Sequence, residues 1–220
     1  MSVEPLASLD RSTLRERALE ALRGAVLSGQ YRPGDHLGEV ELAGSLGVSR
    51  GTVREALRHL QQEGLVSAGN RGMLRVNSLT PTEVRELFQV RAALEGLAVR
   101  ELISSPRRES AVAALRGALT ELADESADMT ARIEADLAFH LLLCRLAGNS
   151  MLVEAWQRLE GRMRVAILNG AAWQAPMMAR DRHAPIVDAI ERADVATAVA
   201  VVDEHMASAA EHFARQSTAD

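Results

Sequence analysis

Residues 42–57, which read LAGSLGVSRGTVREAL, constrain this chain more than any other segment because they form two short helical patterns joined by a tight turn. Gly47 ends the first pattern, and glycine is the usual residue where a helix stops in a left-handed conformation. Ser49 then stands where its hydroxyl can cap the next helix. This arrangement predicts a helix-turn-helix, a motif whose second helix lies in the major groove of DNA.

The predicted second helix begins with residues that suit contacts to nucleic acid. Arg50, Thr52 and Arg54 supply long cations and a hydroxyl, the groups that bond phosphates and base edges. Residues 65–76 then read as two short strands around a glycine-rich turn, which is typical of a wing, and Arg71 at its tip is placed to reach the minor groove. The alternative, a small helical domain with a solvated arginine face, does not explain the hairpin.

This N-terminal segment resembles the GntR superfamily of bacterial transcription regulators. The resemblance implies that Arg50, Thr52, Arg54 and the wing residue Gly72 contact DNA. Two positions depart from common family forms, because Gly51-Thr52 replaces a frequent Thr-Pro and Val40 replaces an arginine of some members, so the operator sequence stays open. The matching stretches are Arg32-Pro33-Gly34-Asp35, Leu46-Gly47-Val48-Ser49-Arg50, Val53-Arg54-Glu55-Ala56-Leu57, Gly64-Leu65-Val66 and Arg71-Gly72.

Composition narrows the class of protein further. A chain of 220 residues suggests one or two domains, and 47% apolar residues can fill a core. The single cysteine, Cys144, excludes an internal disulfide, and no apolar run reaches the ~18–20 residues that span a membrane, so we expect a cytoplasmic protein. The net charge is −5, with a small positive balance in residues 1–78, so we expect two copies of the DNA-binding domain to act together.

The remaining sequence predicts a second domain of a different kind. After a winged domain at 1–76 and a linker at 77–81, residues 82–220 show apolar residues at helical spacing without a strand pattern. The predicted fold is therefore mostly α, with an N-terminal winged helix-turn-helix and a C-terminal all-α antiparallel bundle. Helices are expected near 82–103, 107–124, 129–147, 150–170, 177–192 and 194–216.

Four residues of the predicted bundle stand in positions where they can converge. Asp136 and His140 are four residues apart and so share a helix face. His183 and His205 lie at similar offsets before and after the expected turn at 193–194, so an antiparallel hairpin sets them at one level. Three imidazoles and a carboxylate suit a divalent transition metal. Geometry alone also allows each histidine to be a separate residue that is packed in the core or solvated. The metal site and this alternative both stay open.

Beyond the linker, the chain is similar to the FCD domain, the helical effector module of the FadR subfamily of GntR regulators. The resemblance implies that Asp136, His140, His183 and His205 hold a divalent ion, zinc or nickel, and that Arg91 is a pocket arginine. Arg162 is expected near the level of Asp136 by its distance from the turn at 148–149; for both arginines the alternative is a surface ion pair. The matching stretches are Val90-Arg91-Ala92-Ala93-Leu94-Glu95, Asp136-Leu137-Ala138-Phe139-His140, Gly148-Asn149, and His183 with Ile186-Val187-Asp188-Ala189-Ile190 and His205.

Together these features predict a DNA-binding transcription regulator rather than an enzyme. It is expected to bind a pseudo-palindromic operator as a homodimer, because one recognition helix has too little interface for specificity. The resemblance implies a small organic-acid effector at the metal-containing pocket and release of a repressor from DNA. Two alternatives are a regulator switched by the ion itself and a metal-dependent hydrolase. The hydrolase is disfavoured because no glutamate stands in an evident general-base motif.

Overall fold

The computed structural model describes residues 14–69, 72–123, 127, 129–168 and 178–216. These residues divide into two compact units, which we describe separately. The first comprises the described residues up to Gln62 together with Val66–Val76, and the second comprises Glu63–Leu65 and the described residues from Asn77 onward. None of the helices in the described part of the chain is long and apolar enough to cross a membrane.

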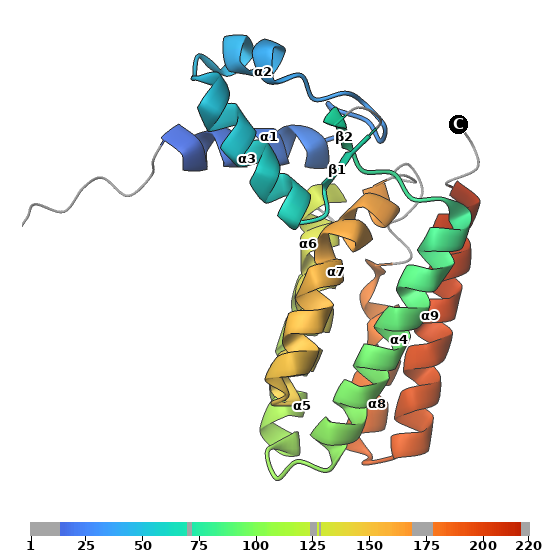
Figure 1. The fold of residues 1–220 in the computed structure, drawn as a ribbon. Helices are drawn as coiled ribbons and strands as arrows, with labels where there is room; N and C mark the ends of the chain where they lie inside the picture. Colours follow the sequence, from blue (N-terminus) through green and yellow to red (C-terminus); the bar gives the residue numbers. More distant parts are fainter. Residues whose placement is uncertain (1–13, 70–71, 124–126, 128, 169–177, 217–220) are drawn as a thin grey trace, which may run out of the picture. The chain divides into compact units, whose positions relative to one another are not determined.

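The first unit is a winged helix-turn-helix, as the sequence predicts. Its core is closed by apolar side chains that α3 turns inward, among them Val53, Leu57 and Leu60, each fully buried. The elements, shown in blue to green in Figure 1, are α1 (Leu14–Leu27), α2 (Glu39–Leu46), α3 (Arg50–Gln62), β1 (Val66–Ala68) and β2 (Leu74–Val76).

The turn between α2 and α3 follows from its local chemistry. Gly47 takes a left-handed conformation with φ of 65°, which a side chain would strain, and so ends α2. The Ser49 hydroxyl accepts a hydrogen bond from the Thr52 backbone N–H at 3.1 Å and caps α3. This pair of signals sets the start of the recognition helix at Arg50.

The wing is a two-stranded antiparallel hairpin in which Val66 pairs with Val76. Its turn is closed by a hydrogen bond from the Gly69 N–H to the Met73 carbonyl at 2.7 Å, and Gly72 has a positive φ of 74°. Arg71, predicted to lie at the wing tip, falls outside the described residues. Its role in DNA binding stays a prediction.

The second unit is an all-helical bundle in which α4 packs lengthwise against α9 (Figure 1). Thr80 and Glu83 form a reciprocal capping box at the start of α4, and Pro81 occupies its first position. The predicted helices are present with ends that differ by a few residues. They are α4 (Pro81–Ile103), α5 (Arg108–Glu121), α6 (Met129–Leu146), α7 (Ser150–Leu168), α8 (Arg180–Glu191) and α9 (Val195–Gln216).

The buried residues of the described bundle are apolar except in one cluster. Leu102, Leu115, Leu143 and Trp156 are fully buried among the helices. Every buried polar or charged residue in the described chain belongs to the second unit and lies on α4, α6, α8 or α9. These six residues are Arg91, Glu95, Asp136, His140, His183 and His205, which we call the polar cluster.

Candidate functional sites

The polar cluster brings residues from distant parts of the sequence into one buried site. Charged groups are rarely buried unless they are paired, because removing them from water is costly. Here the helices supply opposite charges and imidazoles together: α4 carries Arg91 and Glu95, and α6 carries Asp136 and His140. The histidines of α8 and α9 complete the set. The bundle is therefore built around a site rather than around a purely apolar core.

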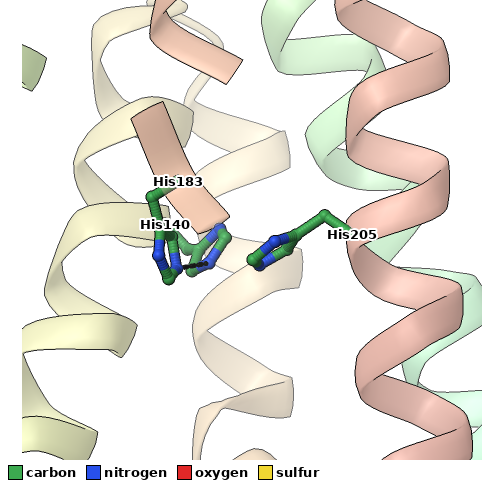
Figure 2. A group of neighbouring side chains, drawn as sticks. All are labelled: His140, His183 and His205. Carbon is green, nitrogen blue, oxygen red and sulfur yellow. Dashed lines mark hydrogen bonds between the residues drawn. The ribbon is translucent and has the colours of Figure 1, made fainter. Parts of the chain in front are cut away.

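The three histidines point toward one another from α6, α8 and α9, as Figure 2 shows. One ligand nitrogen from each of His140, His183 and His205 lies within 4.8 Å of the others. The ring centroids of His183 and His205 are 4.7 Å apart, which agrees with the hairpin argument for α8 and α9. Asp136 joins this group at His183, whose Nε2 lies 3.0 Å from Asp136 Oδ1.

Hydrogen bonds at the outer nitrogens decide which atoms face the centre. His140 Nδ1 lies 2.6 Å from Glu95 Oε2, and His183 Nδ1 lies 2.9 Å from the Ala179 carbonyl. Burial opposes ionisation of Glu95, but His140 and Arg91 beside it lower its pKa to about 2, so the carboxylate accepts from His140. The carbonyl of Ala179 can only accept, so His183 Nδ1 carries a proton as well. Each Nε2 therefore faces inward.

The inward-facing atoms are a set of nitrogen and oxygen atoms of the kind that bind a cation. Burial and Arg91 lower the pKa of His140, against the opposite influence of Glu95 and Asp136. His140 Nε2 and His183 Nε2 are 3.1 Å apart, and the second of these also faces Asp136. Nitrogen and carboxylate ligands at this spacing fit a divalent transition ion, whose positive charge would attract all of these converging atoms.

Asp136 and His205 have the chemistry that such a site requires. Burial opposes ionisation of Asp136, yet His183, His140 and Arg91 hold the pKa of its carboxyl below the usual range. Burial and the neighbouring His140 and His183 lower the pKa of His205 well below its ordinary value, which keeps this imidazole neutral. His205 Nδ1 is buried and makes no hydrogen bond within the described structure. A deprotonated carboxylate and a neutral imidazole are the ligand forms of these side chains.

Arg91 is buried instead of forming a surface ion pair. It lies beside the three histidines His140, His183 and His205, which we call the histidine group. Its Nε donates to Glu95 Oε1 at 2.7 Å, and its Nη2 lies 3.8 Å from Asp136 Oδ2. Arg91 Nη2 is buried and has no hydrogen-bond partner among the described residues. This nitrogen therefore makes an ion pair with Asp136 but keeps unused hydrogen-bonding capacity.

Glu95 belongs to the site, although sequence reasoning named it only as part of a stretch that matches the family. It is fully buried and accepts from Arg91, His140 and Trp156, the last through Nε1 at 3.1 Å. A carboxylate behind a ligating histidine fixes its tautomer and ring orientation. The sequence signal was its position four residues after Arg91 and four before the apolar Val99, which puts it on an inward face.

The structure does not bring Arg162 to the polar cluster. α7 turns Gly161 and Met163 inward, so Arg162 between them is exposed. The hairpin argument that selected Arg162 sets the height of a residue along a helix but not the direction of its side chain. Arg164 is partly buried, where it pairs with Glu134 at 2.7 Å and with Glu160 at 2.8 Å.

The recognition helix presents its predicted DNA-binding residues unequally. The Arg50 and Arg54 side chains are 63% and 60% exposed, while Thr52 is partly buried and its hydroxyl lies 2.9 Å from that of Ser49. Arg54 donates two hydrogen bonds to the Glu39 carboxylate of α2, at 2.8 and 2.7 Å, and Arg50 approaches it at 4.0 Å. Glu39, which sequence reasoning did not single out, thus orients Arg54.

A winged helix-turn-helix with exposed arginines on its recognition helix, attached to a helical domain with a buried polar cluster, defines a DNA-binding regulator. Residues 14–76 match the model of the gntR family of bacterial regulatory proteins, and residues 86–208 match that of the FCD domain. The chain therefore belongs to the GntR family and is a transcription regulator with the FadR-like domain architecture.

Similar proteins agree with this assignment. The chain is 31% identical over 204 residues to the probable D-xylose utilization operon transcriptional repressor of Paenarthrobacter nicotinovorans, covering 91% of the chain and 88% of the relative. It is 34% identical over 160 residues to the Nta operon transcriptional regulator of Aminobacter aminovorans, covering 71% and 74%. These relatives regulate transcription and are not enzymes, which sets aside the hydrolase alternative.

Solved structures give the same fold. A putative GntR regulator from Rhodococcus sp. RHA1 has a TM-score of 0.73 and 26% identity, covering 92% of this chain and 98% of that one. E. coli McbR/YncC shares the fold with a TM-score of 0.71 at 22% identity, covering 93% and 99%.

Proposed function

We propose that this regulator is a repressor that binds operator DNA as a homodimer and is released by a small organic acid bound at a metal-containing polar cluster. The observation that supports it best is the meeting of His140 Nε2, His183 Nε2 and Asp136 Oδ1, three atoms of the kinds that bind a transition-metal ion. Repression is proposed because the Paenarthrobacter relative is named as the probable transcriptional repressor of a D-xylose utilization operon.

The residues that would hold the ion are Asp136, His140, His183 and His205. Zinc or nickel suits three imidazoles and one carboxylate, and a bound ion with open positions would accept a carboxylate oxygen from the effector. The surrounding residues orient the ligand side chains and exclude water from the site. Glu95 fixes the ring of His140, and the Ala179 carbonyl fixes that of His183.

Arg91 is proposed to bind the effector. Its Nη2 is buried near Asp136 but makes no hydrogen bond in the described structure, so a carboxylate that enters the site would gain a charge-assisted hydrogen bond there. Arg91 and Glu95 both lie on α4, the helix that begins directly after the linker. An acid that binds one arrangement of α4 more tightly than another would shift the population of regulator molecules that can hold an operator.

A homodimer is supported by the surface of the bundle. Val90, Ala93 and Leu97 follow one face of α4, and the first and last of these are 50% and 38% exposed. Ala93 lines a groove of about 430 Å³ between α4 and α9, whose rim includes Arg85 and Glu211. An apolar stripe beside charges of both signs can pack against its own copy, as a two-fold interface requires.

The test combines metal content, acid binding and operator binding. We would measure metal by elemental analysis, and DNA affinity by fluorescence anisotropy with and without a chelator and a panel of organic acids. Metal in the wild type that is lost in His205→Ala, but retained in the control His36→Ala, is the expected result, since His36 is exposed in the winged domain. Metal retained in His205→Ala would contradict the ligand assignment.

The same assay separates the two modes of regulation. If an acid releases DNA only from the metal-loaded protein, the metal is necessary but not sufficient, as we propose. If adding or chelating metal alone switches operator binding, the ion itself is the signal. Arg91→Gln should keep the metal and lose the acid response, because it removes the charge but no ligand of the ion.

A further inference from the structure

Four buried side-chain nitrogens make no hydrogen bond within the described structure. They are Arg91 Nη2, Arg182 Nε, His205 Nδ1 and His212 Nε2. All four belong to arginine or histidine residues of the helical unit, and a buried polar group without a partner costs free energy. Arg91 and His205 belong to the polar cluster already described. Arg182 and His212 do not, and the proposed function gives them no role.

Arg182 and His212 lie on the two helices that carry the neighbouring cluster histidines. His212 follows His205 by seven residues on α9, which is two helical turns, roughly 10 Å, along the same face. Arg182 directly precedes His183 on α8, and α8 packs against α9. A ligand roughly 10 Å long that lay along this face of α9 would therefore span the distance from His205 to His212.

The surroundings of His212 favour an anion. Burial lowers the pKa of His212, and the positive charges of Arg215 and Arg182 lower it further, so both arginines lie near this ring. A neutral imidazole can still donate through a protonated Nε2, and the buried Arg182 Nε–H is a donor without a hydrogen-bond partner in the described structure. The neighbouring acid Glu211 is held by Arg85 at 2.7 Å.

We propose that Arg182 and His212 form a second anion-binding subsite, which takes the far acid group of an elongated dicarboxylate effector. The inference rests on the proposed function, in which the near carboxylate binds beside the histidine group and Arg91. Two donors at the far end would make the pocket selective for diacids over monoacids of equal length, because a methyl group there leaves both nitrogens unpaired.

The test is calorimetric titration of the metal-loaded full chain with two matched series of acids. One series runs from glutarate to suberate, and the other from pentanoate to octanoate. We expect at least one diacid to bind about tenfold or more tightly than its monoacid. Arg182→Gln and His212→Gln should each remove most of that preference while leaving monoacid affinity and metal content unchanged. Arg180→Gln, an exposed arginine at the start of the same helix, is the matched control.

The outcomes separate this subsite from the proposed function. Equal affinity for diacids and monoacids, or a preference that survives both substitutions, would overturn the subsite and leave the acid-responsive regulator intact. Failure of every acid in both series to bind the metal-loaded protein would overturn both proposals. Far-ultraviolet circular dichroism and unchanged monoacid binding establish that each variant is folded.

Discussion

Replacement of Glu95 by glutamine tests the polar cluster most directly. Glu95 is fully buried and accepts hydrogen bonds from Arg91, His140 and Trp156. Glu95→Gln keeps the shape but removes the negative charge. Among the described residues, it leaves Arg91 with Asp136 at 3.8 Å as its one remaining counter-charge. Breaking a buried pair from one side costs about 3–5 kcal/mol, and the remaining carboxylate places the effect at the lower end.

The lowered pKa of Glu95 leads to a similar value for the loss of folding stability. Its fall from 4.5 to about 2 corresponds to roughly 3 kcal/mol of folding stability. Because the folded-state pKa is lowered, this stability is present above pH 4.5 and is lost as the pH falls from 4.5 toward 2. Both routes predict that Glu95→Gln lowers the free energy of unfolding at pH 7 by about 3 kcal/mol.

Urea denaturation followed by circular dichroism, with chelator present to remove any metal contribution, measures this difference. Glu154→Gln is the matched control, because Glu154 forms an exposed i,i+4 pair with Arg158 on α7 and such pairs contribute about 0–1 kcal/mol. A variant at Glu95 that unfolds within about 1 kcal/mol of the wild type would refute the buried-charge reasoning. So would a loss of stability between pH 4.5 and 2 that is as large in Glu95→Gln as in the wild type.

Three further perturbations test other parts of the molecule. Arg54→Ala should weaken operator binding roughly tenfold or more in anisotropy titrations, since it removes an exposed cation of the recognition helix; unchanged affinity would contradict the assignment of α3. Free zinc at a hundredfold excess over its dissociation constant should add about 2.7 kcal/mol to the stability of protein whose metal and chelator have been removed. No rise in melting temperature would argue against binding of the ion. The double variant Val90→Asp and Leu97→Asp should elute as a monomer in size-exclusion chromatography, and a retained dimer would place the interface elsewhere.

The sequence by itself predicted the features that depend on neighbouring residues. Gly47 and Ser49 mark the end of one helix and the start of the next through backbone conformation and capping, which act over a few residues. Helical spacing in residues 82–216 similarly indicated the bundle and most of its helices. The relative heights of His183 and His205 followed as well, because a short hairpin fixes the register of its two helices.

Only the tertiary structure decided which side chains meet and in which direction they point. The spacing of residues placed Arg162 at the height of Asp136 along the bundle but could not show that its side chain faces solvent. Nor could it show that Glu95 forms hydrogen bonds with Arg91, His140 and Trp156. The two hydrogen bonds from Arg54 to Glu39 likewise join α3 to α2 across the turn. Such contacts depend on how helices rotate and pack against each other, and that rotation is set by the whole core rather than by any local pattern.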